Sequence, residues 1–212
     1  MGCDIHLYIE YKSKKYKSKM VEFDGYKYSW HDFGKCINPG RNYVLFALMA
    51  DVRNYDGQLP VIVKPRGMPD DAGYYSSDDN CIYISENTYD GERTVTMEHA
   101  KRWVESGSSK FINNQQGEPK WVTNPDHHSH SWLNTSEFET IINKYPELED
   151  GWHKRRVDEH NKMVAKANIQ PDSWAYDPPA MNIEPQYQVV LASLKRFEEL
   201  GYDARIVFWF DN

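Results

Sequence analysis

Cysteine is scarce in this sequence, and its spacing excludes the usual cysteine-based sites. The chain of 212 residues contains 3 Cys, at positions 3, 36 and 81, and no Cys-x-x-Cys pair. A structural zinc site with thiolate ligands is therefore not expected. The odd count and the lack of a recognisable secretory signal predict a reducing, cytoplasmic location.

Long apolar runs are also absent, and the balance of charge is negative. No segment reaches the roughly 18 consecutive apolar residues of a membrane-spanning helix, so no membrane association is expected. The formal net charge of −7 disfavours duplex nucleic acid, because the phosphate backbone is negative as well. The five lysines within residues 12–19 are interpreted as a solvent-exposed hairpin tip. A small phosphorylated ligand is compatible with this composition, since a few local arginines can hold it.

Aromatic and alternating segments are plentiful, and they predict one α+β domain over residues 1–212. We expect strands at residues 3–11, 20–23, 26–28, 81–85 and 204–210, a turn at 24–25, and a short extended piece at 60–63. We expect helices at residues 43–52, 96–106, 136 onward, 151–168 and 187–200, and loops at 31–42, 55–80, 107–125 and 170–184. The terminal strands should be central and adjacent in a mixed or antiparallel sheet covered by four or five helices. Residues 150–184 are expected to form an exposed elaboration.

The first strand carries an acid and an imidazole on one face. Asp4 and His6 are two residues apart, so their side chains point to the same side of the sheet. The intervening apolar residues face the other way and are expected in the core: Cys3, Ile5, Leu7 and Ile9. An acid and an imidazole on one rigid strand can bind a metal, orient a proton transfer or hold a polar ligand.

A second group of chemically active residues, the histidine cluster, lies at residues 126–132. His128 and His130 at i and i+2 of an extended segment can chelate a transition metal, with Asp126 as a third ligand. The candidate metal ligands are thus Asp4, His6, Asp126, His128 and His130. The alternative is a polar loop that leads into the next helix. Ser129 is not favoured as a nucleophile, because no Gly-x-Ser-x-Gly motif is present.

Two Arg-Asn pairs flank the predicted helix at residues 43–52. Arg41-Asn42 lies where the helix begins, and the helix N-terminus itself favours an anion. Arg53-Asn54 lies at the far end, where a cation also suits the helix dipole for structural reasons. Arg66 adds a third guanidinium, which could bind phosphate or pair with neighbouring carboxylates.

Several of these segments resemble a family of small proteins encoded by tailed bacteriophages and related prophages. The resemblance is carried by Met-Gly-Cys-Asp-Ile-His at residues 1–6, by residues 41–43 with 45–47 and 52–54, by Pro65-Arg66-Gly67 with residues 69–71, and by Asp126 with residues 128–129 and 131–133. It implies a viral protein that acts in the cytoplasm of an infected bacterium. By analogy with other small phage proteins, it also implies a role against host defence.

Three functions follow as alternatives, and whether the protein is an enzyme stays open. The first is sequestration of a small phosphorylated ligand, with a nucleotide-type immune signal favoured. Its expected binding residues are Asp4, His6, Tyr8, Arg41, Asn42, Tyr43, Arg53, Asn54, Arg66, His128, Ser129 and Trp132. Tyr8, Tyr43 or Trp132 would stack on a base.

The second alternative is a hydrolase or phosphodiesterase that degrades such a ligand. His6 or His128 would serve as acid or base, and Asp4 would orient it. No cofactor is required, although a divalent metal could take part. The third alternative is an inhibitor that docks on a host defence enzyme through its acidic surface. A homo-oligomer is compatible with all three.

Overall fold

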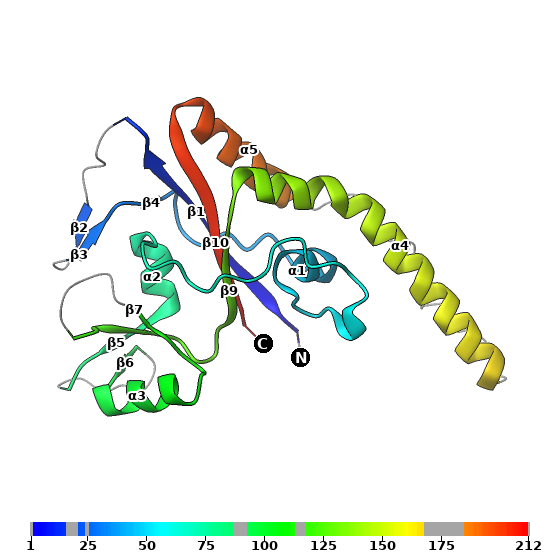
Figure 1. Ribbon diagram of the computed structural model, residues 1–212, viewed down its shortest axis with the longest axis horizontal. Helices are drawn as coiled ribbons and strands as arrows, with labels where there is room; N and C mark the ends of the chain where they lie inside the picture. The colour runs from blue at the N-terminus through cyan, green and yellow to red at the C-terminus, as the bar shows by residue number, and fades with distance from the viewer. Residues whose placement is uncertain are drawn as a thin grey trace.

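The computed structural model describes residues 2–15, 21–23, 26–86, 93–112, 118–167 and 185–211. Its elements are, in order, β1 (Asp4–Ser13), β2 (Val21–Phe23), β3 (Tyr26–Tyr28), β4 (His31–Asp32), α1 (Tyr43–Ala50), the 3₁₀ turn η1 (Tyr55–Gly57), α2 (Tyr74–Asn80), β5 (Cys81–Ile84), β6 (Thr94–Val95), α3 (Met97–Glu105), β7 (Phe111–Ile112), β8 (Trp121–Thr123), β9 (His128–Asn134), α4 (Thr135–Ala167), α5 (Pro185–Glu199) and β10 (Tyr202–Asp211). The expected single α+β domain is confirmed (Figure 1).

The central sheet has the strand order β4-β1-β10-β9, and all of its neighbouring strands are antiparallel. β1 and β10 pair along their whole lengths, from Asp4 opposite Asp211 to Ser13 opposite Tyr202. The terminal strands are thus central and adjacent, as expected. Both are rich in β-branched and aromatic residues, which suits strands that are covered on both faces.

One face of this sheet bears the larger hydrophobic core. The core-facing residues of β1 are those expected from its alternation, Cys3, Ile5, Leu7 and Ile9, and all four are buried. They pack with side chains of α1, α4 and α5, which lie on this side of the sheet. Helix α1 is buried on all sides, from Val44 to Ala50.

The other face of the central sheet is covered by α2 and a second, smaller sheet. The smaller sheet has the order β6-β5-β8-β7 and combines one parallel with two antiparallel pairings. Tyr8, Val207 and Trp209 of the central sheet pack here against residues such as Met68 and Cys81. The side chains that share a face with Asp4 and His6 therefore lie between two layers.

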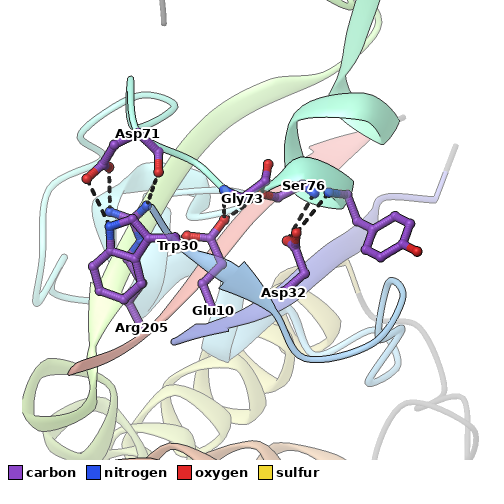
Figure 2. Close-up of polar contacts among 8 residues, drawn as sticks. Glu10, Trp30, Asp32, Asp71, Gly73, Ser76 and Arg205 are labelled. Atoms are coloured by element: carbon purple, nitrogen blue, oxygen red, sulfur yellow. Dashed lines mark hydrogen bonds and ion pairs between the residues drawn. The ribbon is translucent and has the colours of Figure 1, made fainter. Parts of the chain in front are cut away.

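The predicted loop at residues 55–80 is wrong for its last part, because α2 forms there. The sequence of α2 has no helical hydrophobic stripe, and long-range carboxylates stabilise its N-terminus instead. Asp32 accepts hydrogen bonds from the backbone of Tyr75 (2.9 Å) and Ser76 (3.2 Å). Glu10 accepts from the backbone N–H of Gly73 (2.6 Å) and from the Ser76 hydroxyl (2.5 Å), as Figure 2 shows. These acceptors satisfy N–H groups that a helix start leaves without partners.

Glu10 itself is held by an ion pair across the sheet. The Nε–H of Arg205 donates to Glu10 Oε2 at 2.7 Å, and its Nη1–H donates to Asp71 Oδ1 at 2.9 Å (Figure 2). The Trp30 ring lies 4.0 Å from the guanidinium carbon and donates its own N–H to Asp71 (2.9 Å). Burial raises the pKa of Glu10, and the Arg205 charge opposes this shift. We call Glu10, Arg205 and their hydrogen-bond partners the Glu10 network.

Other expectations need smaller corrections. The expected extended piece at residues 60–63 is not a strand, whereas residues 107–125 contain β7 and β8. The helices expected from 136 onward and at 151–168 are one helix, α4, which continues through Pro146. Its start is a capping box between Asn134 and Glu137, each accepting a backbone N–H from the other.

The loop expected at residues 31–42 is wrong at its start, because β4 forms there and pairs with β1. Several other elements agree with the sequence. Thr96 caps α3 by accepting the N–H of His99, and Gly107 follows that helix with a φ of 77°. The hairpin of β2 and β3, the strand β5 and the helix α5 are confirmed. The expected turn at 24–25 and loop at 170–184 lie outside the described residues.

Candidate functional site

The face that carries Asp4 and His6 holds a group of rings around one tryptophan. His6 on β1 lies opposite Trp209 on β10, and the two rings are stacked at 5.7 Å and 5°. Tyr8 stacks on the same indole at 5.5 Å. His127 and His130 lie at 5.7 and 6.3 Å from it. We call His6, Tyr8, His127, His130 and Trp209 the aromatic layer.

Only His127 and His130 of the histidine cluster belong to this layer, because β9 is irregular. Ser129 has a φ of 51°, and the pairing of β9 with β10 shifts register between Phe208 and Phe210. His128 therefore lies beside Phe210, on the opposite face of the sheet, with its Nδ1 3.0 Å from the Ser129 hydroxyl. His130, two residues on, returns to the aromatic layer. The two predicted clusters thus meet, but through His127 and His130 rather than His128.

His6 is the centre of a chain of three groups. Its Nε2 donates to Asp211 Oδ2 at 3.0 Å, and its Nδ1 lies 3.8 Å from the Cys36 sulfur. Cys36 is brought here because the neighbouring Ile37 forms a β-bridge with Leu7 of β1. The contacts with Cys36 and with Asp211 raise the pKa of His6 to about 9, against the effect of burial. The imidazole of His6 is therefore protonated at neutral pH.

His127 and His130 are in the opposite state. Both imidazoles bond the same oxygen, Asn80 Oδ1, with His127 Nδ1 at 3.1 Å and His130 Nε2 at 2.7 Å. Burial is the main cause that lowers the pKa of each to about 4, and the charge of His6 adds to it for His127. Because the shared oxygen accepts, each neutral ring donates there and keeps its other nitrogen as an acceptor.

Two buried donors beside these rings lack partners in the part of the chain that the structure describes. They are Asn80 Nδ2 and Trp209 Nε1, and both residues are fully buried. Native proteins rarely leave such groups unpaired, and exceptions are often filled by water or a ligand. Asn80 is the last residue of α2, so the Glu10 network that fixes this helix also fixes the position of Asn80.

The arrangement separates the proton states of two neighbouring imidazoles. The rings of His6 and His127 are 5.5 Å apart, one protonated and one neutral near pH 7. Titratable neighbours whose pKa values are pushed apart can act as a general acid and a general base. Such a pair can transfer protons to and from a small molecule held between or beside the rings.

Asp4 and Arg41 form an ion pair instead of joining His6. Arg41 donates Nε to one oxygen of Asp4 at 2.7 Å and Nη2 to the other at 2.8 Å. This contact lowers the pKa of Asp4. The expectation that Asp4 orients His6 is therefore wrong, since Asp211, which pairs with Asp4 across the strands, takes that place.

The predicted asparagines lie in the loops around α1. Asn42 is the N-cap of α1, accepting from Leu45 N at 2.9 Å, and its amide donates to the Tyr145 hydroxyl at 2.8 Å. Asn54 donates to the Asp51 side chain at 2.7 Å and exchanges two hydrogen bonds with the backbone of Leu59. Both side chains thus hold the local backbone.

The other predicted arginines also have protein partners. Arg53, with a φ of 57°, donates to the Tyr55 hydroxyl at 2.8 Å and to the Gly2 carbonyl at 3.3 Å. Its guanidinium carbon lies 6.0 Å from the ring of the partly exposed Tyr43. Arg66 forms an ion pair with Glu137 and lies 4.3 Å over the Trp132 ring. Arg53 lies near Gly2 at the start of the chain, and Arg66 lies beside β9.

The candidate metal ligands are not gathered at one point. Within the described ranges, no group of three or more His, Cys, Asp or Glu side chains has a geometry that could hold a metal ion. Asp4 pairs with Arg41, His6 with Asp211, and His130 with Asn80. The participation of a divalent metal stays a prediction.

Six residues of the site were not among the predicted ones: Cys36, Asp79, Asn80, His127, Trp209 and Asp211. Asp79 accepts a hydrogen bond from the Tyr8 hydroxyl, and burial raises its pKa. The alternation of the last strand places Trp209 and Asp211 on one face, which the sequence does show. Whether these two side chains lie on the same face as His6 depends on how β10 pairs with β1, and no local sequence signal gives that pairing.

Comparison with known proteins adds no relative: no protein-family model, curated protein or solved structure matches this chain. In the part of the chain that the structure describes, no helix has the length and apolarity to cross a membrane. Fold and geometry define an α+β protein with an imidazole-rich candidate site between its two four-stranded sheets.

Proposed function

We propose that this protein is a hydrolase that cleaves a small phosphorylated ligand by general acid–base catalysis. The observation that carries the proposal is the protonated ring of His6 at 5.5 Å from the neutral ring of His127. This is the second of the three alternatives from the sequence. His6 keeps its expected role, while His127 replaces His128 and Asp211 replaces Asp4.

His127 is suited to be the base. Its Nδ1–H is directed to Asn80, which leaves Nε2 with a free lone pair for the proton of an attacking water. As the water oxygen bonds to phosphorus, that proton moves to His127. His6 gives its proton to the leaving oxygen as the phosphorus–oxygen bond breaks. Exchange with solvent then restores both rings.

Asp211 is suited to orient the acid. Its carboxylate bonds Nε2 of His6 and leaves the Nδ1 side of the ring to face the ligand and Cys36. A carboxylate in this position fixes the ring orientation and stabilises the imidazolium.

Arg41 is the best placed of the predicted arginines to contact a phosphate. Two of its N–H groups bond Asp4, whose side chain lies on the same strand face as that of His6. The Arg41 side chain is about half exposed. The guanidinium has five N–H groups, so the others can face a ligand. A nucleotide signal of host defence is the substrate that the phage resemblance favours.

The test is incubation of the protein with a panel of cyclic and linear oligonucleotide signals, followed by chromatography and mass spectrometry. We expect new products, and a rate that falls about 100-fold or more in His6→Gln and in His127→Gln. His153→Gln, on α4 away from the site, is the matched control and should retain the rate. Because the base must be neutral and the acid protonated, kcat/KM should be level between about pH 4 and about pH 9.

The same samples separate the alternatives. Ligand recovered intact after heat release, with binding lost in Arg41→Met, would replace hydrolysis by sequestration. Neither binding nor turnover across the panel would contradict both, and would leave docking on a host protein as the hypothesis to pursue.

A further inference from the structure

The three cysteines of this chain lie in different surroundings. Cys3 is fully buried in the larger core, and Cys81 is buried under the second sheet. Burial raises the pKa of both thiols, which makes them poor nucleophiles at neutral pH. Cys36 is partly exposed and lies in the loop beside β1.

Cys36 is also in contact with an imidazole. Its sulfur lies 3.8 Å from His6 Nδ1, and the other nitrogen of that ring is 3.0 Å from Asp211 Oδ2. The side chains of His6 and Asp211 are 32% and 38% exposed, so a small reagent can reach this chain of groups from solvent. A thiol beside an imidazole that is itself bonded to a carboxylate is an arrangement found at reactive cysteines.

The charges that face His6 support its protonated state. Asp211 contacts the ring directly, and Asp4 and Asp79 also interact with its charge. His127, the nearest ring, is neutral. The environment thus combines a partly exposed thiol, an imidazolium and a carboxylate in the order found at activated nucleophiles.

We propose that Cys36 is a thiol modification site, activated by His6, that forms mixed disulfides with low-molecular-weight disulfides. The thiolate of Cys36 attacks one sulfur of the disulfide, a new sulfur–sulfur bond forms, and the original bond breaks. The leaving thiolate takes a proton from solvent and departs as a thiol. The small disulfide is the oxidant, so no further reagent is needed, and excess thiol reverses the reaction.

The modification would act on the candidate site. A disulfide-bonded group on Cys36 would occupy the space next to His6 Nδ1, the side of the ring from which the proton leaves. This consequence rests on the proposed hydrolase activity, whereas the reactivity of Cys36 does not.

The experiment uses the full folded chain and dithiobis-nitrobenzoate, an aromatic disulfide that releases a coloured thiol. At pH 6, we expect about one thiol per chain to react about tenfold faster than glutathione. Mass spectrometry of peptides should place the adduct on Cys36, with Cys3 and Cys81 as internal controls. Cys36→Ser should abolish the fast phase, and His6→Gln or Asp211→Asn should slow it, with circular dichroism to confirm folding.

Access is tested with methyl methanethiosulfonate, a much smaller reagent. If Cys36 reacts with both reagents no faster than glutathione, or if His6→Gln leaves the rate unchanged, the inference is wrong. Labelling of Cys3 or Cys81 before Cys36 would also overturn it. No phosphorylated ligand is present in this assay, so a failure of the hydrolase proposal leaves its result intact.

Discussion

Two pairs of opposite charge bridge β1 and β10 on the same face of the sheet, and they differ in burial and in how completely their surroundings are hydrogen-bonded. Glu10 and Arg205 are nearly fully enclosed, with exposed side-chain fractions of 0% and 6%, and both Glu10 oxygens accept hydrogen bonds. His6 and Asp211, four residues away along β1, are about one third exposed. Beside the second pair lie two buried donors, Asn80 Nδ2 and Trp209 Nε1, that have no partner among the described residues.

The difference shows how one strand face can hold a structural site and a reactive site. The Glu10 network stabilises the start of α2, and the end of the same helix carries Asn80 to the aromatic layer. The fully bonded pair thus fixes the frame, and the accessible pair keeps proton-transfer capacity. Buried polar networks with every group satisfied add rigidity, whereas unsatisfied groups mark places for a ligand or water.

The largest expected effect is on the enclosed pair. Arg205→Met removes one partner and leaves the Glu10 carboxylate buried without its counter-charge, which should lower the free energy of unfolding by about 3–5 kcal/mol. Urea unfolding followed by circular dichroism measures the change. The double variant with Glu10→Met and Arg205→Met is the matched control, and it should recover much of the loss because no buried charge remains. Equal loss in both variants would show that packing, not charge, dominates.

The second prediction concerns the pH dependence of the accessible pair. The pKa of His6 is raised from 6.5 to about 9 in the folded state, so its contribution to stability is complete below pH 6.5 and is lost as the pH rises through 9. His6→Gln should therefore destabilise the protein at pH 6 and have little effect above pH 9.5. Urea unfolding at both pH values checks this, with His153→Gln as control. A loss of stability that is the same at both pH values would contradict a protonated His6.

The sequence could predict the strands and the face on which each side chain lies better than the partner of each side chain. Alternation placed Asp4 and His6 on one face, and the apolar runs at both ends of the chain indicated central strands. The partner of His6 depends on the register of β10 with β1, which is set by packing over the whole sheet. The separation of His128 from His130 depends on the left-handed backbone at Ser129, for which a serine gives no signal.

Long-range contacts explain why the sequence did not predict α2 or the contact between Cys36 and His6. Helix α2 has little intrinsic tendency to form, and its start is stabilised by Glu10 and Asp32, which are more than 40 residues away in the chain. Cys36 reaches His6 only because a loop residue, Ile37, pairs with Leu7. Neither contact could be predicted from local patterns, so the sequence located the reactive residue types but not their neighbours.

The smallest expected effect on stability belongs to a third pair, Asp4 and Arg41, which extends the comparison to the exposed end of β1. Its geometry is bidentate, yet the Arg41 side chain is 52% exposed, and exposed pairs contribute little to folding. Asp4→Asn and Arg41→Met should leave the urea midpoint nearly unchanged. If Arg41 contacts phosphate, Arg41→Met should raise KM for the phosphorylated ligand, whereas Asp4→Asn, which frees the guanidinium, should lower it or leave it unchanged. A clear shift of the midpoint in both variants, with equal KM values, would instead assign this pair to the frame of the fold.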